Sequence, residues 1–108
     1  MKLPTEIFGD VVVVHSPEEL GAGQADEFEA FLASLQPPRV VLDMDNTEAI
    51  DSAGLTSLLN AFDRLRETDG DVKIATTNTA NRKILEMTRL EQQLEVFDSV
   101  IDAVKSYR

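Results

Sequence analysis

Strand-like and helix-like segments alternate along this chain, and their order limits the folds that it can adopt. The short apolar runs Arg39–Met44 and Val72–Thr76 are each followed by a longer segment in which apolar side chains recur every three or four residues. Strands that alternate with helices are typical of a mostly parallel sheet covered by crossover helices. The sequence therefore predicts the α/β fold class.

The amino-terminal segments depart from this alternation. Leu3–Phe8 and Val11–His15 are separated only by the turn-forming pair Gly9-Asp10, which predicts an antiparallel hairpin. Ser16–Glu19 then offers an N-cap serine, a proline at the first helical position and a glutamate at the third. This pattern predicts a helical turn, which the following glycines interrupt.

Apolar periodicity and the residues that interrupt it give the remaining elements. We expect helices with apolar stripes at Ala25–Leu35 (ended by Pro37-Pro38) and Leu55–Leu65 (ended by Asp69-Gly70), helices at Ala80–Thr88 and Ser99–Tyr107, a polar loop at Asp45–Glu48, and a last strand at Leu94–Phe97.

The 108 residues fit one domain, residues 1–108, which can bury roughly 65% of its surface without covalent cross-links. The chain has no cysteine, which excludes disulfides, thiolate metal sites and cysteine nucleophiles. No apolar run approaches the roughly 20 residues that span a bilayer, and no signal-peptide pattern opens the chain. We therefore expect a cytoplasmic protein.

The net charge of −10 is concentrated in residues 1–54, which carry 11 acids and two bases, whereas residues 55–108 carry nine acids and eight bases. A phosphate backbone or an anionic membrane surface would repel the first half, so we expect neither partner. A basic protein surface would be attracted. The same acidity also keeps a domain of this kind soluble whether or not a partner uses it.

The segment Ile50–Leu55 stands before a leucine-rich helical stripe. Asp51 is suited to cap that helix, because its carboxylate can accept from free N–H groups of the first turn. Ser52 would then occupy the first helical position, and Ala53 and Gly54 would let another backbone approach closely. A phosphate on Ser52 would be stabilised by the helix dipole, and it would add about −1.5 to −2 charges beside Asp51.

One pattern runs through nearly the whole chain and consists of Val40-Val41-Leu42-Asp43, Asp51-Ser52-Ala53-Gly54-Leu55, Val72-Lys73-Ile74-Ala75, Ile84-Leu85-Glu86-Met87-Thr88, Leu90 and Val96-Phe97-Asp98-Ser99. This pattern resembles the STAS domain, and within that family the anti-sigma factor antagonists.

The resemblance implies a bacterial transcription regulator without catalysis, which needs no cofactor or metal. Ser52 would be the phosphoacceptor, modified by a GHKL-type serine kinase that is also the anti-sigma factor. The unmodified protein would bind that factor and free a sigma factor, and a PP2C-type phosphatase would restore it. Asp51, Ala53, Gly54 and Leu55 would form the partner-binding surface around Ser52.

The resemblance also implies a single STAS domain with a sheet of four to five strands, an antiparallel element at its amino-terminal side and about four helices. The segment Ser16–Gly23 departs from the family's usual Gly-x-Leu-Asp stretch, and it should lie near the phosphorylation site. Arg89-Leu90 replaces the usual Gly-Leu, and Ala53 replaces a hydroxyl residue found in many antagonists.

Two other functions remain open. STAS domains also serve as scaffolds or transporter subunits that phosphorylation does not regulate. Separately, Asp43-Met44-Asp45-Asn46-Thr47 matches the Asp-x-Asp-x-Thr opening of a phosphatase family, with Asp43 as nucleophile and Asp45 as acid and base. That family needs a larger domain and carries the motif on its first strand, and here Asp98 and Asp102 are better explained as caps of the last helix.

A receiver domain would use Asp43 as its phosphoacceptor. The chain lacks the acidic pair after the first strand and the lysine after a late strand that a receiver domain needs. His15, the only histidine, is expected to be structural.

Overall fold

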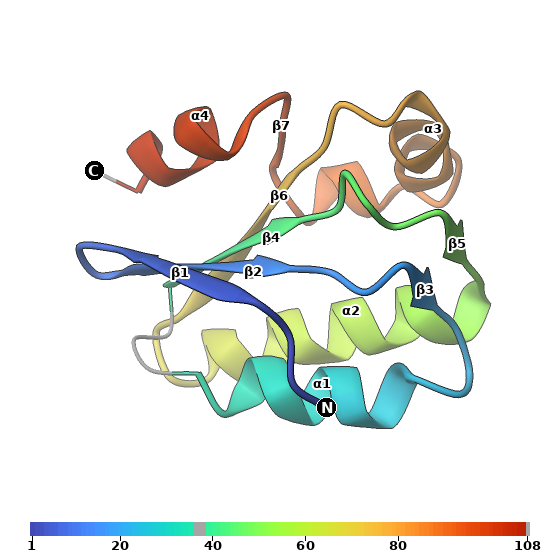
Figure 1. The fold of residues 1–108 in the computed structure, drawn as a ribbon, viewed down its shortest axis with the longest axis horizontal. Helices are drawn as coiled ribbons and strands as arrows, with labels where there is room; N and C mark the ends of the chain where they lie inside the picture. Colours follow the sequence, from blue (N-terminus) through green and yellow to red (C-terminus); the bar gives the residue numbers. More distant parts are fainter. Residues whose placement is uncertain (36–38, 108) are drawn as a thin grey trace.

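The computed structural model describes residues 1–35 and 39–107 (Figure 1). The strands are β1 (Thr5–Phe8), β2 (Val11–His15), β3 (Glu19–Leu20), β4 (Arg39–Asp43), β5 (Ala49–Ile50), β6 (Asp71–Ala75) and β7 (Val96–Phe97). The helices are α1 (Ala25–Ala33), α2 (Ser52–Arg66), α3 (Thr79–Met87), the 3-10 turn η1 (Leu90–Gln92) and α4 (Val100–Lys105).

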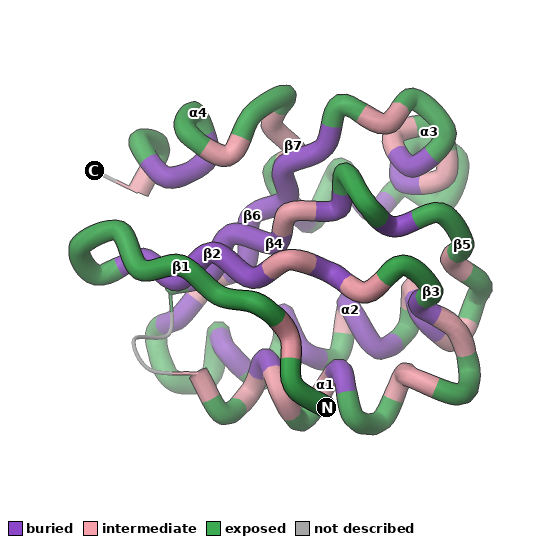
Figure 2. Tube along the Cα trace, in the orientation of Figure 1, coloured by how far each residue is buried: buried purple, intermediate pink, exposed green. Residues whose placement is uncertain are grey.

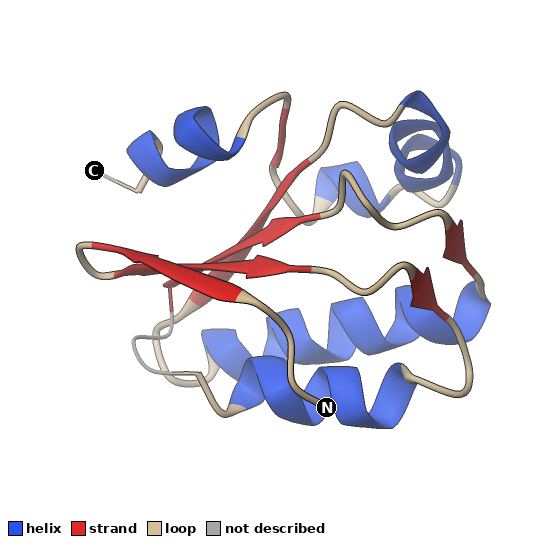
Figure 3. Ribbon diagram, in the orientation of Figure 1, coloured by secondary structure: helices blue, strands red, loops and turns tan. Residues whose placement is uncertain are grey.

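Five strands form the main sheet in the order β1-β2-β4-β6-β7 (Figure 3). β1 runs antiparallel to β2, and the other neighbours are parallel. Gly9, at φ +62, closes the hairpin in a conformation that glycine adopts without strain. The predicted α/β fold class, with its antiparallel amino-terminal pair and mostly parallel sheet, is confirmed.

The predicted helical turn at Ser16–Glu19 is wrong. Glu19–Leu20 forms β3, which pairs in parallel with β5 as a separate two-stranded sheet. Long-range hydrogen bonds determine the backbone here instead of the local capping pattern. The Ser16 amide donates to the Asp43 carbonyl, and the Glu18 carbonyl accepts from the amides of residues 48 and 49. Extended backbone satisfies more polar groups here than one isolated helical turn would.

The first helix ends at Ala33, earlier than its apolar stripe indicates. Its predicted stop, Pro37-Pro38, lies outside the described residues. The other predicted elements are found within a few residues of their expected bounds, although the strand predicted at Leu94–Phe97 keeps only its last two residues as β7.

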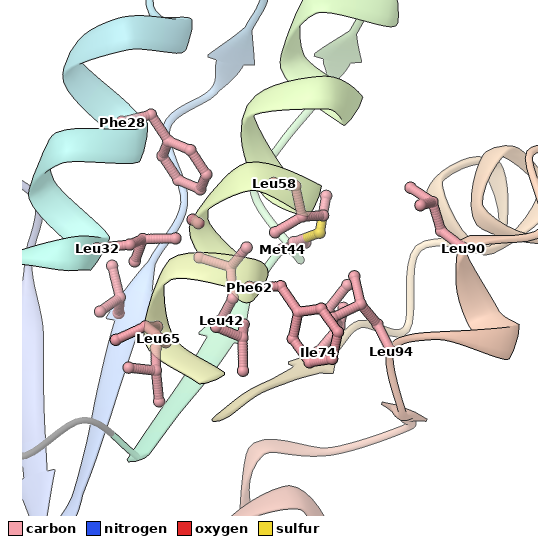
Figure 4. Packing of buried hydrophobic residues seen from close by; sticks show 14 of the residues in the cluster. Phe28, Leu32, Leu42, Met44, Leu58, Phe62, Leu65, Ile74, Leu90 and Leu94 are labelled. Atoms are coloured by element: carbon pink, nitrogen blue, oxygen red, sulfur yellow. The ribbon is translucent and has the colours of Figure 1, made fainter. Parts of the chain in front are cut away.

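The central strands are buried on both faces, as the apolar run at Arg39–Met44 predicts. Val40 and Leu42 belong to the large core under α1 and α2, whereas Val41 faces the smaller core under α4. Figure 4 shows α1 and α2 contributing Phe28, Phe62 and their neighbours to the large core. The sheet is thus a middle layer that presents the carboxyl ends of β2 and β4 toward the β3–β5 sheet and the start of α2, whereas β6 leads to α3 (Figure 1).

Candidate functional site

The candidate site is built on the start of α2, where Asp51 is the N-cap. Its backbone is extended (φ −112, ψ −176), and its Oδ1 accepts from the Gly54 amide at 2.9 Å. A cap that satisfies a first-turn amide fixes where a helix begins. The leucine stripe of α2 then anchors the rest of the helix in the large core. The predicted capping role of Asp51 is confirmed.

The second oxygen of the Asp51 carboxylate reaches the neighbouring loop. Oδ2 accepts from the Ala22 amide at 3.2 Å, so one side chain joins the β3–α1 loop to the start of α2. The hydrogen bond from the Gly54 amide lowers the pKa of Asp51 below its ordinary value. Desolvation opposes part of this lowering, and weaker contributions from the Ala22 and Ala53 amides add to it. The site therefore carries a fixed negative charge at neutral pH.

Ser52 is exposed at the first helical position of α2. Beside it lies a shallow groove between α1 and α2, lined by Asp26 and Glu29 from α1 and by Thr56 and Asn60 from α2. Glu29 is tied across this groove to Asn60 at 3.3 Å and to Arg64 at 3.5 Å. Ser52 thus lies at the positive end of α2, directly after Asp51 and on a groove that Asp26 and Glu29 also line.

Gly54 is buried, and it is the chain's own backbone that approaches it. A Cβ at this position would lie 2.1 Å from the Leu20 carbonyl oxygen, which no side chain can tolerate. The absence of a side chain at Gly54 does allow a backbone to approach closely, but that backbone is the chain's own β3, and the predicted place of Gly54 in a partner-binding surface stays a prediction. Ala53 and Leu55 are half-buried, so Asp51 and Ser52 are the residues of this segment that reach the surface most fully.

The Ser16–Gly23 segment lies against the site, as its predicted place near Ser52 requires. Besides the bond from Ala22, Gly21 lies so close to Asp51 that a Cβ there would be 2.9 Å from the Asp51 carboxylate. The mini-sheet of β3 and β5 holds this loop in place. Changes in the loop sequence therefore change the immediate surroundings of Ser52.

The phosphatase-like aspartates are held by other contacts. Asp43 accepts from His15 Nδ1 at 3.0 Å and from the Asp45 amide at 3.0 Å, and Asp45 accepts from the Thr77 amide at 2.6 Å. Within residues 1–35 and 39–107, no three His, Asp or Glu side chains are grouped so that they could hold a metal ion.

His15 joins three strands. Its Nε2 lies 2.7 Å from Glu6 on β1, and its Nδ1 contacts Asp43 on β4. The hydrogen bond with Glu6, and then the hydrogen bond and charge of Asp43, raise the pKa of His15 above its ordinary value against the opposing effect of burial. The interpretation of this residue as structural agrees with these contacts.

The cap predicted for the last helix is wrong in part. Ser99, and not Asp98, caps α4 by accepting from the Asp102 amide at 3.1 Å, whereas Asp98 pairs with Arg82 on α3. Asp98 turns to α3 because the serine hydroxyl next to it already satisfies the free amide.

Two buried polar residues escaped the sequence interpretation. Asn81 on α3 donates through Nδ2 to the carbonyls of Met44 and Thr47, both at 2.9 Å, and so holds the β4–β5 loop that leads to the site. Lys73 lies under α4, where its Nζ donates to Ser106 Oγ at 2.8 Å and stands 4.3 Å from the Tyr107 ring centre. No local signal marks either residue, because their partners are distant in sequence.

In the part of the chain that the structure describes, no helix is long and apolar enough to cross a membrane. The family model described as the STAS domain matches residues 2–103 of the sequence. None of the curated proteins matches the sequence.

Several solved structures share the fold. An anti-sigma factor antagonist from Mycobacterium paratuberculosis superposes with a TM-score of 0.84 at 22% identity, over 97% of this chain and 92% of its own. The unphosphorylated anti-sigma factor antagonist SpoIIAA, known from Bacillus, gives 0.79 at 15% identity, over 99% and 96%. A sulfate transporter family protein from Wolinella succinogenes gives 0.81 at 17% identity, over 94% and 87%. At these identities the likenesses establish the fold alone.

Proposed function

The chain belongs to the STAS domain family, and on that premise we propose that it is an anti-sigma factor antagonist switched by phosphorylation of Ser52. In this proposal the unmodified protein binds an anti-sigma factor that is also a GHKL-type serine kinase, and so frees a sigma factor. Phosphorylation ends that binding, and a PP2C-type phosphatase reverses the modification. The protein acts in the cytoplasm as one domain, with no catalysis of its own.

The observation that carries the proposal is the exposed hydroxyl of Ser52 directly after a capping aspartate. A kinase can reach this hydroxyl without unfolding the helix, because the cap bonds are made by Asp51 and leave Ser52 free of that task. The related structures add support, since SpoIIAA is known in both an unphosphorylated and a phosphorylated form.

The surrounding charges explain how a phosphate would act as a switch. A dianion on Ser52 would stand beside the ionised Asp51 and on the same groove as Asp26, while Glu29 of that groove is already paired with Arg64. Burying this charge against a partner adds desolvation and repulsion of about 2–5 kcal/mol, which corresponds to roughly 30- to 5,000-fold weaker binding. Unmodified serine adds neither cost.

The test measures binding to the anti-sigma factor kinase of the same host by titration calorimetry. Ser52→Ala should bind as tightly as the parent and accept no phosphate, whereas Ser52→Asp should bind at least tenfold more weakly. Thr79→Ala, which removes an exposed hydroxyl at the first helical position of α3 directly after its N-cap Asn78, is the matched control and should behave as the parent in both assays. Equal binding by Ser52→Ala and Ser52→Asp, together with phosphate uptake by Ser52→Ala, would refute the proposal.

One observation favours a second candidate, a constitutive subunit of a scaffold or transporter. The sulfate transporter family protein of Wolinella succinogenes shares the fold with a TM-score of 0.81. Such a subunit would bind its partner with or without the Ser52 hydroxyl. Intact mass of the protein isolated from its host, before and after PP2C treatment, separates the two functions, since only the switch requires a removable phosphate on Ser52.

A further inference from the structure

One residue of the β4–β5 loop is buried although its neighbours are exposed. The loop lies largely on the surface (Figure 2), yet Thr47 is 0% exposed between the exposed residues Asn46 and Glu48. Burying a hydroxyl is costly unless it is hydrogen-bonded. Thr47 Oγ1 donates to the Pro17 carbonyl at 2.7 Å, so the buried hydroxyl joins the β4–β5 loop to the segment that leads into β3.

The backbone of Thr47 is itself held in place. Asn81 Nδ2 donates from α3 to the Thr47 carbonyl at 2.9 Å, and the Thr47 amide donates to the Met44 carbonyl at 3.1 Å. Asn81 is also buried. Because both backbone groups of Thr47 are bonded, its hydroxyl extends from a fixed backbone and can hold its acceptor in a fixed place.

The acceptor depends on this hydroxyl. Among residues 1–35 and 39–107, the Pro17 carbonyl accepts only from Thr47 Oγ1, whereas the next carbonyl, that of Glu18, accepts from the amides of residues 48 and 49. Proline has no amide hydrogen, so Pro17 cannot be bonded to the β4–β5 loop through its own nitrogen. The Thr47 hydroxyl is therefore what ties Pro17 to that loop.

The place of β3 decides the surroundings of Ser52. β3 begins two residues after Pro17 and pairs with β5 through only two residues. The Leu20 carbonyl lies over Gly54, where a Cβ would be only 2.1 Å from that oxygen, and the next residue packs against Asp51. A shift of β3 would therefore disturb the first turn of α2 and the cap that precedes Ser52.

We propose that Thr47 is a positioning residue for the Ser52 site. Its hydroxyl holds the Pro17 carbonyl, and this contact keeps β3 over the first turn of α2 and keeps the Asp51 cap in place. Without the hydroxyl, the site spends part of its time in displaced arrangements, and a partner that needs the fixed arrangement binds only the fraction that remains. The effect on a partner rests on the proposed function, whereas the effect on the cap does not.

Two substitutions separate the hydroxyl from the rest of the side chain. Thr47→Val keeps the branched shape and removes the donor, whereas Thr47→Ser keeps the donor and should behave as the parent. Thr68→Val is the matched control. The Thr68 hydroxyl also donates to a backbone carbonyl, that of Leu65 at 3.0 Å, but it lies just beyond the other end of α2.

Amide hydrogen exchange of the full chain tests the cap directly. The Gly54 and Ala22 amides, which both donate to the cap, should exchange at least about fivefold faster in Thr47→Val than in the parent. In Thr47→Ser and Thr68→Val they should stay within about twofold of the parent.

The Val41 amide, in the centre of the sheet, is the reference, since a general loss of stability accelerates it as well. If Thr47→Val accelerates Val41 and Gly54 equally, Thr47 is only structural and the proposal is overturned. Unchanged exchange at Gly54 and Ala22 would overturn it too.

Phosphorylation of Ser52 by the anti-sigma factor kinase of the same host tests the consequence. Thr47→Val should raise the KM at least about fivefold and change kcat less than about twofold, because fewer molecules present the site in the required arrangement. Thr47→Ser should restore the KM of the parent.

The two proposals fail in different ways. An unchanged KM in Thr47→Val, in a protein whose Ser52→Ala variant takes up no phosphate, would overturn the positioning role and leave the proposed function intact. A parent that takes up no phosphate would refute the proposed function, and amide exchange at Gly54 and Ala22 would then decide whether Thr47 positions the cap.

Discussion

At the scale of single residues, the site is shaped by two backbones that almost touch. Leu20 on β3 crosses over Gly54 in the first turn of α2, and only a residue without a side chain fits beneath it. In most helices a glycine costs about 1 kcal/mol relative to alanine. At Gly54 the close contact with the Leu20 backbone outweighs this helical preference for alanine.

Gly54→Ala should accordingly destabilise the protein. The new methyl group would have to displace the Leu20 backbone, and overpacking of this kind costs about 1–3 kcal/mol or more, which exceeds the gain in helix propensity. Urea unfolding measures the difference. Gly23→Ala is the control, since a Cβ there has no atom within 4 Å, and its stability should stay within about 0.5 kcal/mol of the parent. A stable Gly54→Ala would contradict the β3–α2 packing.

At the scale of elements, His15 connects strands that are not all adjacent in sequence. It stands on β2 between Glu6 of β1 and Asp43 of β4, with a carboxylate at each ring nitrogen. A protonated imidazole donates to both, whereas a neutral ring donates to only one. The hairpin is therefore held more firmly when His15 carries its proton.

This arrangement predicts a pH dependence of stability. The folded pKa of His15 lies above its ordinary value of 6.5, so the imidazolium favours the folded state. The contribution is fully present below pH 6.5 and is lost as pH rises through the folded pKa. Urea unfolding at several pH values from 6 upward should show a falling free energy of unfolding in the parent.

The His15→Gln variant provides the comparison. Because the chain has no other histidine, the fall above pH 6.5 should be markedly smaller in this variant. Parallel curves for the two proteins would show that the contacts with Glu6 and Asp43 do not favour the protonated ring.

At the scale of the whole molecule, charge and size together set a dependence on salt. The molecule measures 31 × 26 × 24 Å and carries −10, so at 0.01 M salt, where the screening length is about 30 Å, its acids repel one another across the whole fold. At 0.15 M that length falls to about 8 Å. The unfolded chain separates the charges and feels less repulsion.

The melting temperature should therefore rise as NaCl increases from about 0.01 to 0.15 M and change much less from 0.15 to 0.5 M. Scanning calorimetry of the parent chain at the three concentrations checks this. Measurements at one low protein concentration keep any association out of the comparison. A melting temperature that falls over the first interval would mean that attractive pairs, such as Arg82 with Asp98, outweigh the net repulsion.

How far the sequence predicts this molecule depends on the range of the interactions involved. β4 and the cap at Asp51 are predictable, since a β-branched run and an N-cap act within a few residues. β3 is not, because its two residues are extended only through pairing with β5. Lys73 alternates with Val72 and Ile74 as a solvent-facing residue would, yet α4 covers that face and buries it.

The partner surface around Ser52 is the part that stays a prediction. Asp51 and Ser52 lie where the motif places them, but Gly54 is interior, and the acids Asp26 and Glu29 come to the groove from α1. No pattern in the sequence links those acids to Ser52, because the packing of α1 on α2 brings them there. The proposed site thus combines the consecutive residues Asp51 and Ser52 with side chains that are distant from them in sequence.

The division of labour between Asp51 and Ser52 has a consequence for how such proteins change over generations. Asp51 and Gly54 hold the architecture, and among the described residues no hydrogen bond to the Ser52 hydroxyl contributes to it. If Ser52 is the switch that we propose, a single codon change at this position abolishes regulation and leaves the fold intact. A regulated and a permanently active descendant of one ancestor would then differ in sequence at position 52 alone. Their folds would be the same, so the fold would not distinguish them.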